Sequence, residues 1–325
     1  MITPIADVAT AIDQILDSAT ADPIENGQKT LEINGDDPFQ FVVAWGEEHS
    51  RRELEPELLN PKSRECFCDW AKWAGEEALN VSDHTQAGVL RRRSKAHLFS
   101  ASCGPEPCSE NFADMLALAE LLTSSHLCTL NLPGSGASGP QHFHTQIMPL
   151  SLRDAGKQVP NQIHRLLDNI KAKPNGMTLD SGVVICELDS PVWGVRLEFP
   201  KTMSASQIGK KLFSSVHQGI RYGSQLRLSY NVYVRWNVRP RVVDVTIRSS
   251  AHECPFLGID TKAAIENVRW RWGWLECIGG LPARSAAFAD SSVYDHHFWQ
   301  RVYSRMTLTN DIKQSVLNRI SELLI

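Results

Sequence analysis

The sequence contains no long hydrophobic run. None of its apolar stretches approaches the roughly 18 residues that a membrane-spanning helix needs. The opening residues, MITPIADVATAIDQ, also lack the basic segment followed by an apolar one that is typical of a secretory signal. These absences argue against a membrane protein and predict a soluble protein of the cytoplasm.

The sequence also has little excess charge and no dense cysteine framework. A formal net charge of −4 gives no global attraction to nucleic acid or to an anionic membrane, so we expect neither as a partner. The basic run at residues 91–93 is typical of a solvated surface. The eight cysteines are scattered over 325 residues, unlike those of a small disulfide-rich secreted domain, and most are expected to be reduced and buried.

The length and the hydrophobic pattern predict an α+β protein of two lobes, residues 1–157 and 158–325. Each half combines a strand-rich body with a helix of similar length, which is compatible with a duplication. The strands are expected to be mainly antiparallel. Apolar residues at helical spacing predict helices over residues 5–18, 110–124, 160–171 and 205–221 and a helical tail after residue 291. Predicted strands lie within residues 29–33, 39–45, 89–101, 126–132, 145–150, 182–188, 193–199, 226–236 and 241–247.

The most informative stretch is GSGASGPQHFHTQ, residues 134–146. Alternate residues of a β-strand share a face, so His142, His144 and Gln146 are predicted to line one surface while the residues between them pack behind it. The preceding glycines permit backbone conformations that other residues avoid. Successive N–H groups in such a loop can surround an anion. The stretch therefore predicts a phosphate-binding loop beside two imidazoles.

A neutral imidazole beside bound phosphate favours nucleophilic attack on phosphorus. His144 is the predicted nucleophile, and a covalent intermediate would divide one difficult transfer into two easier ones. His142 would orient the site or stabilise charge. Gln146 would donate to a non-bridging phosphate oxygen while remaining neutral, and the hydroxyls of Ser135 and Ser138 would add donors.

The same histidines allow a different interpretation, a cupin-like metal site. Gly136 lies six positions before His142, and a G-x5-H-x-H opening is similar to the first cupin motif. The cupin pattern then requires a glutamate three or four residues later. Met148 and Pro149 stand there instead, and neither is a ligand for a hard cation.

Asn131, the GAS of residues 136–138 and the HFHTQ of residues 142–146 together resemble the histidine triad superfamily. They are most similar to its transferase and phosphorylase branch, which has a glutamine where the hydrolase branch has a third histidine. That branch includes galactose-1-phosphate uridylyltransferase, diadenosine tetraphosphate phosphorylase and GDP-L-galactose phosphorylase. LNPKSRECFC, residues 59–68, resembles its Asn-Pro segment, and the resemblance spans about residues 58–150. It implies a histidine-triad-like fold of two lobes.

By this resemblance the protein is a nucleotidyltransferase of the phosphorylase type that needs no cofactor for its chemistry. His144 would take a nucleotidyl group from a dinucleoside polyphosphate or an NDP-hexose, and phosphate or a sugar phosphate would remove it. Three residues separate Ser138 from His142 where the family more often has two, which leaves the substrate class open. A catalytically silent nucleotide-binding relative is the alternative, and a homodimer is left open. The residues implied to bind phosphate or nucleotide are Asn60, Asn131, Ser135, Gly136, Ala137 and Ser138.

Two further features extend the site hypothesis. Some uridylyltransferases carry a structural zinc, and Cys66, Cys68, His97 and His142 occur in the matching order. The C-x-C spacing is tighter than is usual for zinc, and packing is the alternative role of the thiols. WRWGW, residues 270–274, would place alternate indoles on one face, which suits a nucleotide base, a core or an interface.

Overall fold

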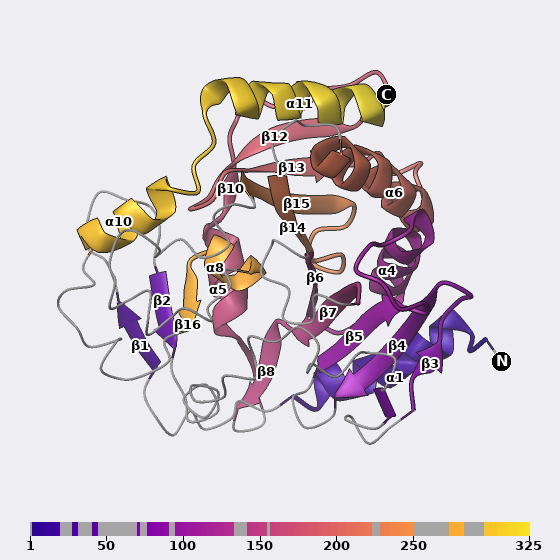
Figure 1. Ribbon diagram of the computed structural model, residues 1–325. Coiled ribbons are helices and arrows are strands. Elements are labelled where there is room, and N and C mark those ends of the chain that lie inside the picture. The colour runs from indigo at the N-terminus through magenta and orange to yellow at the C-terminus, as the bar shows by residue number, and fades with distance from the viewer. Residues whose placement is uncertain are drawn as a thin grey trace.

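The computed structural model describes residues 2–19, 28–31, 41–44, 70–71, 77–90, 95–132, 142–154, 157–222, 228–249, 273–282 and 296–325. A large antiparallel sheet runs through both predicted lobes, in the order β10-β12-β13-β15-β14-β6-β7-β5-β4-β3, with β11 paired to β12 (Figure 1). The fold is therefore α+β, as the sequence predicts. The strands of the first half are β3 (Leu79–Asn80), β4 (Thr85–Leu90), β5 (Lys95–Ser100), β6 (His126–Asn131) and β7 (His144–Pro149). Those of the second half are β10 (Lys171–Ala172), β11 (Met177–Thr178), β12 (Val184–Asp189), β13 (Gly194–Glu198), β14 (Leu228–Val234) and β15 (Val242–Ser249).

The same connection of elements occurs twice along the chain. In the first half β4, β5, α4 (Ser109–Leu121), β6 and β7 follow one another, and the sheet order is β4-β5-β7-β6. In the second half β12, β13, α6 (Ala205–Leu212), β14 and β15 follow one another, and the order is β12-β13-β15-β14. The two units meet where β6 pairs antiparallel with β14, Asn131 opposite Asn231. The repeated topology supports a duplication of one unit, with which the sequence was compatible.

The two faces of the sheet differ in character. One face packs its Val, Ile and Leu side chains against α1 (Ile5–Asp17), α4, α6 and α11 (Asn310–Leu324), and this contact forms the main hydrophobic core. On the other face Gln146, Thr129, Tyr233 and Asp244 lie side by side on four adjacent strands. We call this second surface the polar face. The alternation of each strand thus separates the core from a surface that can carry chemistry.

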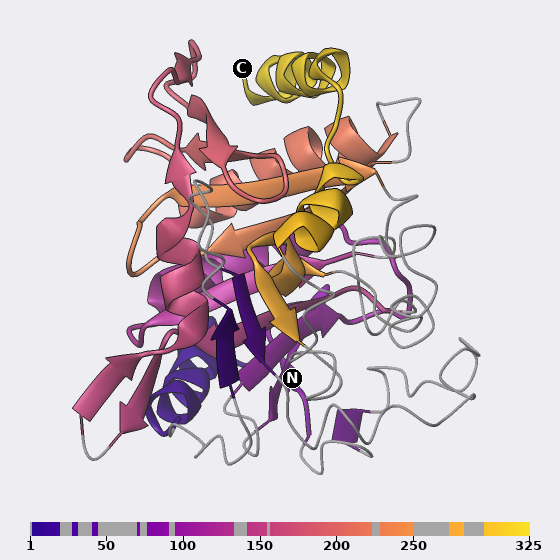
Figure 2. The same ribbon diagram turned by 90° about the vertical axis from the view of Figure 1, so that its left-hand side faces the viewer.

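Smaller elements lie over the polar face (Figure 2). The helix α8 (Trp274–Cys277) leads into β16 (Gly280–Pro282), which pairs parallel with β2 (Phe41–Ala44), and β2 pairs antiparallel with β1 (Gln28–Leu31). The helix α10 (His296–Ser304) precedes α11, and β8 (Ser151–Asp154) pairs with β9 (Lys157–Pro160). Within the described ranges, no helix has the length and apolar character that a membrane crossing requires.

Two of the predicted elements differ in detail from the structure. The extended stretch predicted over residues 89–101 contains the end of β4 and all of β5, which pair as neighbours. The single helix predicted over residues 205–221 is α6 followed by a π-helical segment, η6 (Phe213–Tyr222). The hydroxyls of Ser214 and Ser215 donate to the carbonyl of Lys211 at 3.0 and 2.7 Å. They compete with backbone N–H groups for that oxygen, which favours the wider turn.

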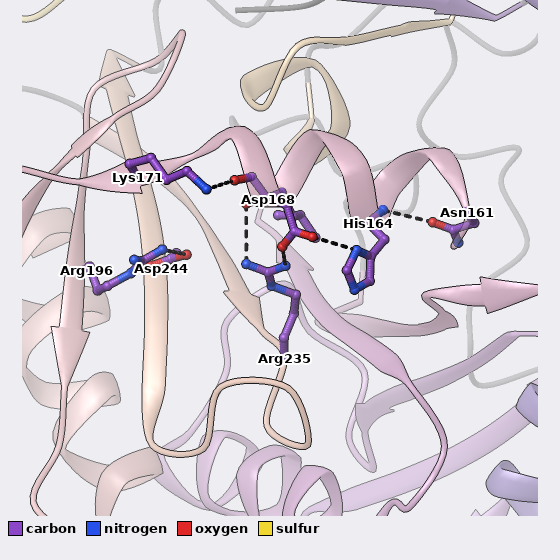
Figure 3. Close-up of polar contacts among 8 residues, drawn as sticks. Asn161, His164, Asp168, Lys171, Arg196, Arg235 and Asp244 are labelled. Atoms are coloured by element: carbon purple, nitrogen blue, oxygen red, sulfur yellow. Dashed lines mark hydrogen bonds and ion pairs between the residues drawn. The ribbon is translucent and has the colours of Figure 1, made fainter. Parts of the chain in front are cut away.

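An ion pair joins the helix α5 (Gln162–Asn169) to Arg235, the residue after β14 (Figure 3). Arg235 donates to Asp168 at 2.6 Å, and His164 lies 2.9 Å from the same carboxylate. Burial alone would raise the pKa of Asp168, but the hydrogen bond and charge of Arg235 outweigh it and hold the pKa below its usual value. Nearby, Arg196 and Asp244 form a bidentate pair at 2.7 and 2.9 Å. Each is less than a tenth exposed.

Candidate functional site

His142 and Phe143 directly precede β7, and the next three residues of HFHTQ begin it, in the alternation that the sequence predicts. Phe143 and Ile147 belong to the main hydrophobic core. His144 lies opposite Phe99 of β5, and Gln146 lies opposite Thr129 of β6, so both side chains are on the polar face. The strand predicted over residues 145–150 is confirmed as β7.

His144 is held in one protonation state. Its Nδ1 lies 3.1 Å from the carbonyl oxygen of His142. A carbonyl oxygen can only accept, so the proton is on Nδ1 and Nε2 carries the lone pair. Burial lowers the pKa of His144 to about 4, although the hydrogen bond to His142 opposes the shift. His144 is therefore a neutral imidazole at physiological pH, with its nucleophilic nitrogen unprotonated.

The segment after β5 holds the start of the motif. The Nε2–H of His142 donates to the carbonyl of Ser100. The N–H of Phe143 donates to the carbonyl of Gly104 at 2.8 Å, and its own carbonyl accepts from the N–H of Ser100 at 3.1 Å. Main-chain bonds on both sides thus fix the residue between the two histidines, and with it the direction of both imidazoles.

An aromatic cluster lies beside the histidines on the same face. The rings of His97 and His144 are 5.9 Å apart, centroid to centroid. Trp70 stacks on Phe99 at 5.4 Å and lies 5.7 Å from His97. The indole of Trp70 packs directly on Gly88, where an added Cβ would lie 2.2 Å from the ring. Trp70 was not among the predicted site residues, and the glycine within β4 is the one signal of a close approach there.

Asn131 and Gln146 both contact the second half of the chain. The Oδ1 of Asn131 accepts from the Nδ2 of Asn231 at 2.6 Å and from the backbone N–H of Trp274 at 2.9 Å. The indole Nε1–H of Trp274 donates to the Oε1 of Gln146 at 3.4 Å. The sequence singled out Trp274 only as one of three alternating indoles, and it gave no signal for Asn231.

The turn that carries Trp274 is itself firmly held. The carboxylate of Glu276 accepts from the N–H of Gly273 at 2.8 Å, and the carbonyl of Glu276 accepts from the hydroxyl of Tyr303 at 2.7 Å. The hydroxyl of Tyr233 donates to the carbonyl of Trp274 at 2.8 Å. Burial raises the pKa of Glu276 to about 7, against the hydrogen bonds that stabilise its charge.

The second half does not repeat the histidine motif. β15 takes the place in the second unit that β7 takes in the first, and it presents Asp244, Thr246 and Arg248 on the polar face. None of these is a nucleophile of the imidazole type. Among the described strands, the imidazoles of this face, His97 of β5 and His144 of β7, therefore lie in the first unit.

The proposed zinc ligands are only partly described. Cys66 and Cys68 lie outside the described residues. His97 faces His144, and the Nε2–H of His142 donates to a carbonyl. In the ranges given above, no three His, Cys, Asp or Glu side chains are arranged to hold a metal ion. Zinc stays a prediction, and no catalytic step depends on it.

The remaining predicted contacts also fall outside the described residues, namely Asn60, Ser135, Gly136, Ala137 and Ser138. The cupin-like alternative finds no support in the fold. Cupins are double-sheet jelly rolls. Here the HFHTQ residues lie on one large sheet that is covered by helices on its opposite face.

Comparison with known proteins gives one informative likeness. No family model matches the sequence, and no curated protein matches it. Among solved structures, the chain is similar to the yeast Ap4A phosphorylase Apa2, whose crystal structure is a complex with AMP. The TM-score is 0.56 at 14% sequence identity, and the match covers 95% of this chain and 99% of that one. The chain therefore has the fold of a diadenosine tetraphosphate phosphorylase, one of the enzyme types that its motif resembles.

Proposed function

We propose that the protein is a nucleotidyltransferase of the phosphorylase type, which cleaves a dinucleoside polyphosphate or an NDP-hexose. The observation that carries the proposal is the state of His144. It is buried and neutral, and its Nδ1–H donates to a carbonyl, which leaves Nε2 as the nucleophile. The likeness to an Ap4A phosphorylase supports the same reaction class.

In the first step, Nε2 of His144 attacks the phosphorus of the nucleotide. A nitrogen–phosphorus bond forms, and the bond from that phosphorus to the bridging oxygen breaks. The oxygen takes the electron pair, and the rest of the donor leaves as a nucleoside polyphosphate or, from an NDP-hexose, as a hexose phosphate. The imidazole becomes positively charged, and the carbonyl of His142, which accepts its Nδ1–H, stabilises that charge.

In the second step, an oxygen of inorganic phosphate or of a sugar phosphate attacks the same phosphorus. The nitrogen–phosphorus bond breaks, and its electron pair returns to Nε2, which restores neutral His144. With inorganic phosphate as acceptor the product is a nucleoside diphosphate. In both steps Gln146 and the serines of residues 134–138 would donate to the non-bridging oxygens.

The test is a substrate panel read by mass spectrometry. Purified protein is incubated with dinucleoside polyphosphates and NDP-sugars, with and without inorganic phosphate. We expect a nucleoside diphosphate only when phosphate is present, and a protein adduct heavier by one nucleotidyl group, a nucleoside monophosphate less one water, when it is omitted. Both signals are expected to vanish in His144→Ala and to persist in His84→Ala, which alters an exposed histidine.

Full turnover by His144→Ala would overturn the mechanism. Nucleotide binding without turnover of any donor would instead identify a catalytically silent relative.

A further inference from the structure

One residue of the second half touches both carboxamides of the first-half site. The backbone N–H of Trp274 donates to the Oδ1 of Asn131 at 2.9 Å, and its indole N–H donates to the Oε1 of Gln146 at 3.4 Å. Trp274 is buried, 6% exposed. Asn131 is on β6 and Gln146 is on the neighbouring strand β7, both on the polar face. Leu130, the residue before Asn131, pairs with Thr145, which lies between His144 and Gln146, so both amides are close to His144.

These contacts decide which way each amide points. A carboxamide has one accepting end and one donating end, and the two look alike in shape. Both groups on Trp274 are donors only, so each must face an oxygen. The Oδ1 of Asn131 also accepts from Asn231 at 2.6 Å, which occupies its second lone pair. The NH2 groups of Asn131 and Gln146 are consequently the ends that Trp274 leaves for a ligand.

We propose that Trp274 is a positioning residue that makes these two amides donors toward the phosphate groups of the substrate. The inference rests on the proposed function. Phosphate oxygens are acceptors only, so a flipped carboxamide would present an oxygen and repel them. By donating to both amide oxygens, Trp274 disfavours the flipped orientation of each carboxamide before the substrate binds. Because Trp274 belongs to the second half of the chain and the amides to the first, both halves are needed to orient the site.

The surroundings of Trp274 fit such a role. Gly273 precedes it, and a Cβ at that position would lie 3.0 Å from the Nδ2 of Asn131 and crowd the donating end of the amide. The hydroxyl of Tyr233 and the carboxylate of Glu276 fix the backbone on either side. Hydrogen bonds to the backbone around Trp274, in addition to packing, therefore set the position of the indole.

Trp274→Phe keeps an aromatic ring and the backbone N–H but removes the indole donor. Removing one donor from an oxyanion site typically lowers kcat by ~10²–10³-fold. Because Trp274 acts through Gln146, whose amide would still donate part of the time, we expect kcat to fall about tenfold or more and KM to rise by no more than several-fold. Trp193→Phe is the matched control, since Trp193 is equally buried and its indole nitrogen has no hydrogen-bond partner among the described residues.

The decisive measurement is a double-mutant cycle on kcat with the donor that the panel identifies. Trp274→Phe should lower kcat in the wild-type background and have no further effect in Gln146→Ala, with thermal unfolding recorded for every variant. Wild-type kcat in Trp274→Phe, or losses that multiply in the double variant, would overturn the inference.

A wild type that turns over no donor would contradict the proposed function, and AMP affinity then provides the test. By calorimetry, Trp274→Phe should bind AMP several-fold more weakly than wild type or Trp193→Phe, and not more weakly than Gln146→Ala. Equal AMP affinity of Trp274→Phe and wild type, or no AMP binding by either, would overturn the inference on this second route.

Discussion

Asp244→Ala would leave the guanidinium of Arg196 inside the protein without its partner. Arg196 and Asp244 are 6% and 5% exposed, and two hydrogen bonds of 2.7 and 2.9 Å join them. Burial by itself lowers the pKa of Arg196, and the hydrogen bonds and charge of Asp244 raise it above its usual value. Removing one member of such a pair costs ~3–5 kcal/mol, because the remaining charge stays desolvated. We expect this loss in the free energy of unfolding.

The pair itself is expected to contribute far less than this figure. Its attraction mostly repays the cost of taking two charges out of water, so replacing both by apolar residues of similar volume is often neutral or stabilising. Arg196→Met combined with Asp244→Leu should therefore regain most of the stability lost in Asp244→Ala. With a urea slope of about 3 kcal/mol per M, the single variant should lower the unfolding midpoint by about 1 M or more.

Urea unfolding followed by tryptophan fluorescence and by far-ultraviolet circular dichroism would measure these midpoints. Glu322→Ala is the control, since Glu322 pairs with Arg319 at 3.1 Å on the surface, with both side chains about half exposed. Exposed pairs of this kind contribute below ~1 kcal/mol. If Asp244→Ala lowers the midpoint no more than Glu322→Ala, the argument from burial is wrong.

Two further substitutions test other parts of the fold. Burial, and then the charge of Arg221, lower the pKa of His217 to about 4, below an unfolded value of ~6.5. The unfolded state therefore binds more protons, and wild type should lose roughly 3 kcal/mol relative to His217→Gln as the pH falls from 7 to 4, measured by urea unfolding at each pH. An unchanged difference between the two proteins would contradict this. Gly88→Ala should cost ~1–3 kcal/mol because its Cβ would lie 2.2 Å from Trp70, whereas Gly104→Ala, with nothing within 4 Å, should be nearly neutral in the same assay.

The sequence predicted the helices and strands better than the contacts that those elements make. The helix over residues 5–18 and the strands that became β6 and β7 followed from periodicity, which depends on neighbours a few positions apart. The π-helical turn of η6 could not be predicted, because it depends on which groups compete for one carbonyl. The zinc ligands and the phosphate loop stay predictions, since Cys66, Cys68 and residues 134–138 lie outside the described ranges.

The sequence by itself determined the α+β class and the placing of His144 and Gln146 on one face, because strand alternation is a local property of the chain. Only the tertiary structure decided how that face is completed. Trp274 and Gln146 are 128 residues apart, and they meet because the two sheet units join at β6 and β14 and α8 lies across the junction. The direction of a carboxamide has no signature in the sequence. It depends on donors that long-range packing brings to it.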